Sequence, residues 1–268
     1  MKTPIKKVIS AIVGEPLAGK ETVGDFGQEY IRRRDLTTSR HRFRDVLEET
    51  LKLLNKEREN GYGITHAGSA ETLLEIAEKW SIESTAQNLA TLTRTLGEHF
   101  GYDTKPIIIG RESLQLMAQI MVEDDAFGED TLAHATCERL VKSPEQVVWA
   151  DGVRWFADEK KLRSYPSSAH PDVIALILYV TASEEIRFKR LQMRRREGEA
   201  AVALEQFRRQ NTAKNEIYIP EIGGRADWKI VNNYDSGDRD KDLEALKKDV
   251  QKFCEAMILT LFGDIPYV

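Results

Sequence analysis

The chain has 268 residues, of which 41% are hydrophobic, so it can form one large domain with a core or a domain with a sizeable insertion. Its net charge of -5 argues against a nucleic-acid partner, and no apolar run approaches the roughly 18–20 residues of a membrane span. The two cysteines, Cys137 and Cys254, lack metal-like spacing and indicate buried thiols in a reducing compartment, the cytoplasm.

The chain begins with a predicted strand, a glycine loop and a helix. Residues 8–13 form a short apolar run that stops at Gly14, which is typical of a buried parallel strand. Residues 20–34 then change to a helical pattern. Strand, glycine loop and helix together are the context in which a phosphate-binding loop is expected.

The middle of the chain is predicted to be helical. A helix is expected over 40–57, where apolar residues recur at spacings of three and four, and two more over 69–100. Another helix is expected to begin near Arg111. Residues 56–105 are therefore predicted to be a helical insertion, in which His66 and His99 lack a paired metal-ligand spacing.

The second half alternates strands and helices. The expected strands are 146–151, 173–180 and 227–232, and the expected helices are 158–163, 183–196 and 241–262. Such alternation predicts an α/β fold, in which helices cover both faces of a mainly parallel sheet. We expect a single domain over residues 1–268.

The first loop carries the pattern G-x-x-x-x-G-K, the phosphate-cradling half of a Walker A loop. Loop N–H groups, the positive start of the helix and the charge of Lys20 all favour phosphate. Glu21 stands where a magnesium-binding Ser or Thr is expected, and Thr22 follows it, so either residue is a candidate at the metal. The predicted ATP-binding residues here are Gly14, Ala18, Gly19, Lys20, Glu21 and Thr22.

The order of motifs resembles the phage-type deoxynucleoside monophosphate kinases, a P-loop NTPase family. Family loops read G-K-D-T before a helix with Ala-Asp-Phe, and Gly24-Asp25-Phe26 fills that last place. Phe43-Arg44-Asp45-Val46-Leu47 resembles the family's Phe-Ala-Asp-x-Leu-Lys, although its Ala and Lys are absent. The later matches are Arg111-Glu112-Ser113-Leu114-Gln115, Asp151-Gly152-Val153-Arg154-Trp155-Phe156 and Ala226-Asp227-Trp228-Lys229-Ile230-Val231-Asn232-Asn233. The resemblance covers most of the chain except about 56–105.

The resemblance implies transfer of the γ-phosphate of ATP, with Mg²⁺, to a nucleoside monophosphate, preferably a deoxynucleotide. Lys20 would contact the β- and γ-phosphates, and Asp151 would hold the metal through water. Arginine forks match phosphate oxygens, and the side-chain amide of Gln115 matches a base edge. The predicted acceptor contacts are Phe43 by stacking, Asp45, Arg111, Gln115 and Arg154.

An arginine-rich helix end, residues 190–200, is the predicted lid. Consecutive helical residues point about 100° apart, so arginines 194–196 cannot all face one site. Arg190 and Arg194 share a face and, with Lys20 and Arg154, are the catalytic candidates. Arg225, after two glycines, is a candidate on the adenine side.

Each assignment has a structural alternative. Asp151 can be a turn or capping residue, the arginines can form surface salt bridges, and Phe43 can be part of the core. A related small-molecule enzyme such as dephospho-coenzyme A kinase, or a nucleotide-binding regulatory protein without turnover, is also compatible with the sequence. The insertion is expected beside the acceptor or in a subunit contact, which would make the protein a homodimer.

Overall fold

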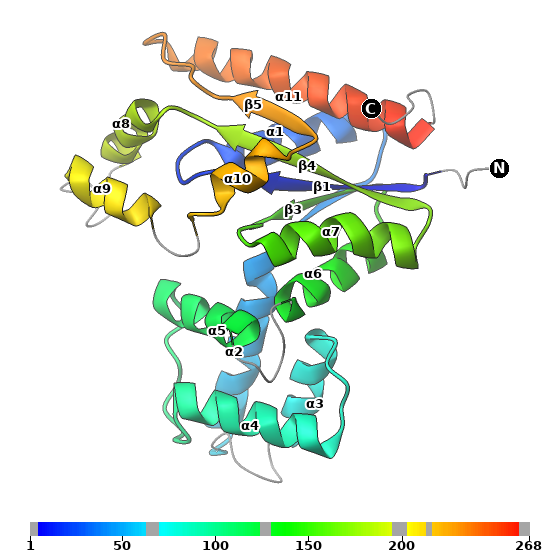
Figure 1. Cartoon of the computed structure of the whole chain (residues 1–268), viewed down its shortest axis with the longest axis vertical. Helices are drawn as coiled ribbons and strands as arrows, with labels where there is room; N and C mark the ends of the chain where they lie inside the picture. The colour runs from blue at the N-terminus through cyan, green and yellow to red at the C-terminus, as the bar shows by residue number, and fades with distance from the viewer. Residues whose placement is uncertain (1–4, 63–69, 124–129, 195–202, 213–215, 263–268) are drawn as a thin grey trace. The chain divides into compact units, whose positions relative to one another are not determined.

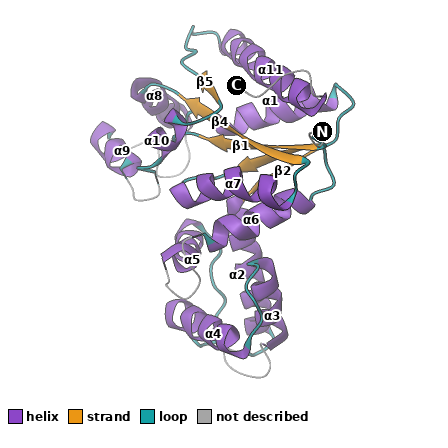
Figure 2. Cartoon of the chain, turned by 45° about the vertical axis from the view of Figure 1, so that its right-hand side comes forward, coloured by secondary structure: helices purple, strands orange, loops and turns teal. Residues whose placement is uncertain are grey.

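The computed structural model describes residues 5–62, 70–123, 130–194, 203–212 and 216–262. The chain divides into two compact units (Figures 1 and 2). The sheet unit comprises Met1–His41 and Leu140–Val268, and the helical unit comprises Arg42–Arg139.

Five strands form the sheet, in the order β2-β3-β1-β4-β5. Strand β1 pairs in parallel with β3 and with β4, and β4 pairs in parallel with β5. The strands are β1 (Lys7–Val13), β2 (Thr38–Arg42), β3 (Val147–Asp151), β4 (Val173–Thr181) and β5 (Trp228–Val231). This α/β architecture confirms the predicted fold class and is consistent with a P-loop NTPase-like fold.

Helices cover both faces of this sheet. Helices α1 (Lys20–Arg32) and α11 (Arg239–Phe262) pack on each other and on β1, while α7 (Phe156–Ala169) lies on the opposite face (Figures 1 and 2). The remaining helices of the unit are α8 (Glu184–Arg194), α9 (Leu204–Asn211) and α10 (Ile219–Gly224).

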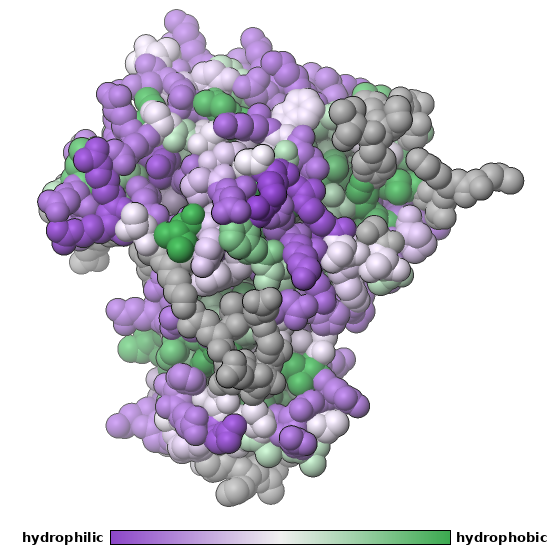
Figure 3. All heavy atoms as spheres, viewed as in Figure 1, coloured by the Kyte–Doolittle hydropathy of each residue, from purple (hydrophilic) through white to green (hydrophobic). Residues whose placement is uncertain are grey.

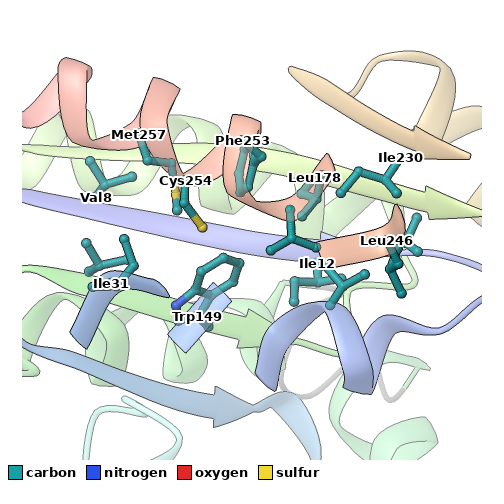
Figure 4. Packing of buried hydrophobic residues seen from close by; sticks show 14 of the residues in the cluster. Val8, Ile12, Ile31, Trp149, Leu178, Ile230, Leu246, Phe253, Cys254 and Met257 are labelled. Carbon is teal, nitrogen blue, oxygen red and sulfur yellow. The ribbon is translucent and has the colours of Figure 1, made fainter. Parts of the chain in front are cut away.

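The core of the sheet unit lies between β1, β3, β4 and the helices α1 and α11 (Figure 4). The edge of Trp149 meets the ring of Phe253, with centroids 6.1 Å apart. A Cβ on Gly27 of α1 would lie 2.3 Å from the Trp149 ring, so glycine permits the close packing of this helix. Cys254 is fully buried in this core and Cys137 is also buried, as predicted.

The helical unit has its own core. Trp80 is buried and donates from Nε1 to Thr50 Oγ1 at 2.9 Å. Its helices are α2 (Phe43–Glu59), α3 (Ala70–Lys79), α4 (Ala86–Phe100), α5 (Arg111–Glu123) and α6 (Thr131–Lys142), the last of which ends in the sheet unit. The predicted insertion, 56–105, lies within this unit, which is larger because it also holds most of α2, all of α5 and most of α6.

Two of the predicted helices have different bounds. The helix expected over 40–57 begins at Phe43, because residues 38–42 form the edge strand β2 beside β3. The helix expected over 158–163 is longer and extends through Pro166 to Ala169. Helices α6, α9 and α10 were not predicted. The predicted lid lies partly outside the described residues, which end at Arg194 and resume at 203.

No helix among the described residues is long and apolar enough to cross a membrane. Hydrophilic side chains dominate the face seen in Figure 3, where hydrophobic residues form separate patches.

Candidate functional site

The loop between β1 and α1 has a constrained backbone. Leu17 has φ 65° and Gly19 has φ 100°, both in the left-handed region. That region is unfavourable for leucine, and such conformations persist only where the surroundings enforce them. A Cβ on Gly14 would lie 2.1 Å from the carbonyl oxygen of Val180. Contact with β4 therefore fixes the start of the loop, and only glycine fits there.

Lys20 is the first residue of α1, and its ammonium lies over the loop. Its Nζ donates to the carbonyl oxygens of Gly14 and Glu15, the latter at 2.9 Å. Burial, and after it the charge of Arg154, lower the pKa of Lys20 to about 8. The carboxylates of Glu216, Asp151 and Glu15 oppose this shift. A phosphate group beside this ammonium would favour its charged form.

Two polar side chains, Arg190 and Asn232, donate hydrogen bonds to the loop backbone. The guanidinium of Arg190 donates to Leu17 O at 3.2 Å and to Asn232 O and Oδ1 at 3.0 Å each. Asn232 in turn donates from Nδ2 to Ala18 O at 2.8 Å, and a Cβ on Gly19 would lie 2.4 Å from this Nδ2. In this structure Arg190 therefore positions the loop backbone. Asn232 was quoted in the family motif, but the sequence suggested no role for it.

Strand β4 contributes a hydroxyl pair beside the loop. Tyr179 donates to Glu15 Oε1 at 2.5 Å and Thr181 donates to the same oxygen at 3.2 Å. Burial, followed by the hydrogen bond to Glu15, raises the pKa of Tyr179 to about 12. The phenol therefore stays a donor at ordinary pH and holds the Glu15 carboxylate against the sheet.

Asp151 ends β3 directly beside β1, where it is paired with Ile12 in the strand register. Arg40 of β2 donates from Nε to Asp151 Oδ2 at 2.6 Å. The same guanidinium donates from Nη1 to Asp25 Oδ1 at 2.7 Å and to Glu21 O at 3.2 Å. Arg40 was not predicted as a site residue, because its segment was expected to be helical.

Arg154 follows β3, and its Nη1 donates to Glu216 Oε1. Its backbone is fixed by Asp158, whose Oδ2 accepts from the N–H groups of Arg154 at 2.9 Å and Trp155 at 3.1 Å. Asp158 is 2% exposed, and this burial raises its pKa to about 6. Neither Asp158 nor Glu216 was predicted, and only the position of Asp158 early in a helix gave a signal.

The remaining candidates of the sheet unit have varied surroundings. Glu21 is exposed and Thr22 is half-buried, both in the first turn of α1. Arg225 donates from Nη2 to Glu159 at 2.6 Å and from Nη1 to Glu221 at 2.8 Å. In this structure the guanidinium of Arg225 is therefore engaged in salt bridges. The side chain of Arg194 lies outside the described residues.

Four of the predicted acceptor contacts belong to the helical unit. Phe43 is only 3% exposed, which favours its alternative assignment as a core residue. Asp45 caps α2, because its Oδ2 accepts from the N–H of Arg42 at 2.8 Å. Gln115 is exposed on α5, and Arg111 is the first residue of that helix, its side chain outside the described part.

Among the described residues, no group of three or more His, Cys, Asp or Glu side chains could hold a metal ion. Mg²⁺ does not require such a cluster, because it usually binds through one or two carboxylates, phosphates and water. The carboxylate of Asp151, which interacts electrostatically with Lys20, is an oxygen ligand of the kind that Mg²⁺ prefers.

Comparisons with known proteins assign no family. No protein-family model matches the chain, and no curated protein matches it. One matching solved structure is "Crystal structure of TT1252 from Thermus thermophilus", with 19% sequence identity and a TM-score of 0.38. The match covers 90% of this chain and 95% of that one.

Proposed function

We propose that the protein is a kinase that transfers the γ-phosphate of ATP to a nucleoside monophosphate, preferably a deoxynucleotide. The observation that carries the proposal is the grouping of Lys20, Asp151 and Arg154 at the glycine loop that follows β1. Each of the three matches a need of phosphoryl transfer, which depends on positioning and on neutralisation of phosphate charge.

Each residue has a distinct role in this proposal. Lys20 neutralises the β- and γ-phosphates, since its ammonium lies against the carbonyl groups of the loop. Arg154 contacts the acceptor phosphate or the transferring group, for which its guanidinium must leave Glu216. Asp151, with Thr22 or Glu21, is the site for Mg²⁺. When bound, Mg²⁺ would supply positive charge that offsets the negative charge of the phosphates.

The acceptor assignment rests on the resemblance of the helical-unit motifs. Arg111 and Gln115 are one helical turn apart on α5, so they lie on the same side of that helix. A phosphate contact from Arg111 and a base-edge contact from Gln115 would together select a nucleotide. The related alternative, a dephospho-coenzyme A kinase-like activity, would use the same donor loop with another acceptor.

A coupled assay with Mg²⁺–ATP tests the proposal across deoxy- and ribonucleoside monophosphates, with dephospho-coenzyme A as an additional acceptor. We expect turnover with at least one monophosphate. Lys20→Ala should abolish it while the melting temperature stays near that of the wild type, since the lysine charge acts on the transferring group. Turnover with dephospho-coenzyme A alone would favour the alternative kinase.

The control separates catalysis from nucleotide binding. If neither protein turns over any acceptor, but the wild type binds ATP and Lys20→Ala does not, the regulatory alternative is favoured. Near-normal turnover by Lys20→Ala would end the kinase proposal.

A further inference from the structure

One guanidinium joins three elements around the proposed metal site. Arg40 of β2 contacts Asp151 at the end of β3, and it also contacts the Glu21 carbonyl and the Asp25 carboxylate in the first turns of α1. Its Nη2 lies 2.5 Å from the same Asp151 oxygen that Nε contacts. Arg40 thus connects the strand that carries the proposed metal ligand with the helix that carries Lys20.

The surroundings hold this guanidinium closely. The Arg40 side chain is 9% exposed, and that of Asp151 is 14% exposed. A Cβ on Gly24 would lie 2.6 Å from Arg40 Cζ, so glycine on this face of α1 leaves the space that the guanidinium fills. Gly24 was predicted only as part of Gly24-Asp25-Phe26, which fills the place of the family's Ala-Asp-Phe.

We propose that Arg40 is a positioning residue for the Asp151 carboxylate in Mg²⁺–nucleotide binding, an inference that rests on the proposed function. By contacting both, Arg40 fixes the distance between Asp151 and the first turn of α1. A metal ion could then bind Asp151 and a side chain of that turn together. Hydrogen-bond partners of metal-ligating carboxylates typically change metal affinity by about 10–100-fold when they are removed.

The opposite effect, competition between the guanidinium and Mg²⁺ for Asp151, is weakened by a neighbouring charge. Asp25 lies 2.7 Å from Arg40 Nη1, so the two charges largely cancel beyond their immediate contacts. Loss of Arg40 therefore removes an orienting contact from Asp151 and adds little attraction for the metal. The structural alternative is a buried ion pair that only stabilises β2, which would leave metal binding unchanged.

The test follows binding of a fluorescent ATP analogue as Mg²⁺ is titrated, and it needs no turnover. In Arg40→Met we expect the Mg²⁺ midpoint to rise about 10–100-fold, with nearly unchanged analogue affinity in EDTA. Arg40→Lys should show most of this rise, because an ammonium cannot replace a fork that reaches three groups. Arg33→Met is the matched control: Arg33 lies just past α1, with Glu29 as its ion-pair partner, and its removal should leave the midpoint in place.

A wild-type midpoint in Arg40→Met overturns the inference alone. A wild-type protein whose analogue affinity does not respond to Mg²⁺ overturns the proposed function together with it. If Arg40→Met does not fold, Gly24→Ala serves instead, since it displaces the guanidinium and keeps every charge. A raised midpoint in Gly24→Ala then supports the positioning role, and an unchanged midpoint contradicts it.

Discussion

Lys20 holds its charge in surroundings that disfavour it. Burial lowers its pKa from 10.5 to about 8, so in the ligand-free protein the charged ammonium is less stable than in the unfolded chain. Two carbonyl oxygens of the loop compensate in part. An anion beside this ammonium, such as a phosphate of the proposed nucleotide, would favour its charged form.

The pH dependence of stability tests this environment. Between about pH 8 and 10.5 the unfolded chain binds more protons at Lys20 than the folded one, so stability should rise with pH in that window. Relative to Lys20→Met, the free energy of unfolding of the wild type should increase there by on the order of 1–3 kcal/mol. Denaturant unfolding at several pH values measures the difference. A flat difference would show that the ammonium is not buried in this way.

Lys20, Asp151 and the loop glycines could be predicted as candidate site residues, because their spacing and their neighbouring strand patterns are local signals. Arg40, Asn232 and Glu216 could not be predicted as site residues. Their partners are far away in sequence: Asn232 contacts Ala18, and Arg40 contacts Asp151. Only the strand order β2-β3-β1-β4-β5 brings such residues together, and an amphipathic pattern does not encode it.

The first turn of helix α7 contains a buried carboxylate, that of Asp158, which also accepts a hydrogen bond from the backbone of Arg154. Asp158 accepts two backbone N–H groups, which favours its charged form, yet burial is the larger effect and raises its pKa to about 6. The segment that presents Arg154 is therefore held by a cap whose charge changes in mildly acidic solution.

Substitutions of Asp158 should distinguish two effects on stability: the hydrogen bonds that its side chain accepts, and the charge that it carries. Because the pKa of Asp158 is higher in the folded protein than in the unfolded chain, its protonation stabilises the fold. This contribution to the free energy of unfolding is fully present below about pH 4 and is lost as pH rises through about 6. Relative to Asp158→Asn, which keeps an acceptor, the wild type should lose on the order of 1–3 kcal/mol of unfolding free energy across that window.

Asp158→Ala serves as the control because it has neither acceptor nor charge. It should be less stable than Asp158→Asn by about 1 kcal/mol at every pH. Thermal or denaturant unfolding of the three proteins from pH 4 to 8 measures both effects. An Asn variant that tracks the wild type at all pH values would contradict a titration of Asp158 in this range.

The long strands and helices were predictable, whereas the short edge strand was not. Strand β4 has nine residues, VIALILYVT. Its continuous apolar run lacks the polar residues that an amphipathic helix would place at regular spacing. Strand β2, TSRHR, is only partly buried and contains no apolar residue, so nothing in its pattern indicates a strand. It forms because the edge of β3 offers a hydrogen-bonding partner, which is tertiary information.

The division into two units has a consequence for the design of deletions. Removing 56–105 alone would cut through the helical core, because Trp80 inside that segment donates a hydrogen bond to Thr50 outside it. A better deletion removes Arg42–Arg139 as a whole. The two cut ends lie close together, since Ser39 Oγ and Ser143 Oγ are 3.1 Å apart, and a linker of about six Gly and Ser residues spans the gap.

We expect the shortened protein to keep Mg²⁺-dependent nucleotide binding and to lose phosphoryl transfer. It keeps the sheet and the donor-site residues Lys20, Asp151 and Arg40, together with Arg190 and Asn232, which contact the loop. It loses the predicted acceptor residues Arg111 and Gln115. Fluorescent-analogue binding and the coupled assay measure the two properties, and circular dichroism confirms folding. The same deletion with Lys20→Ala is the control and should lose the binding. If the folded shortened protein fails to bind nucleotide, the donor site requires the helical unit. The assignment of ATP binding to the sheet unit alone would then be wrong.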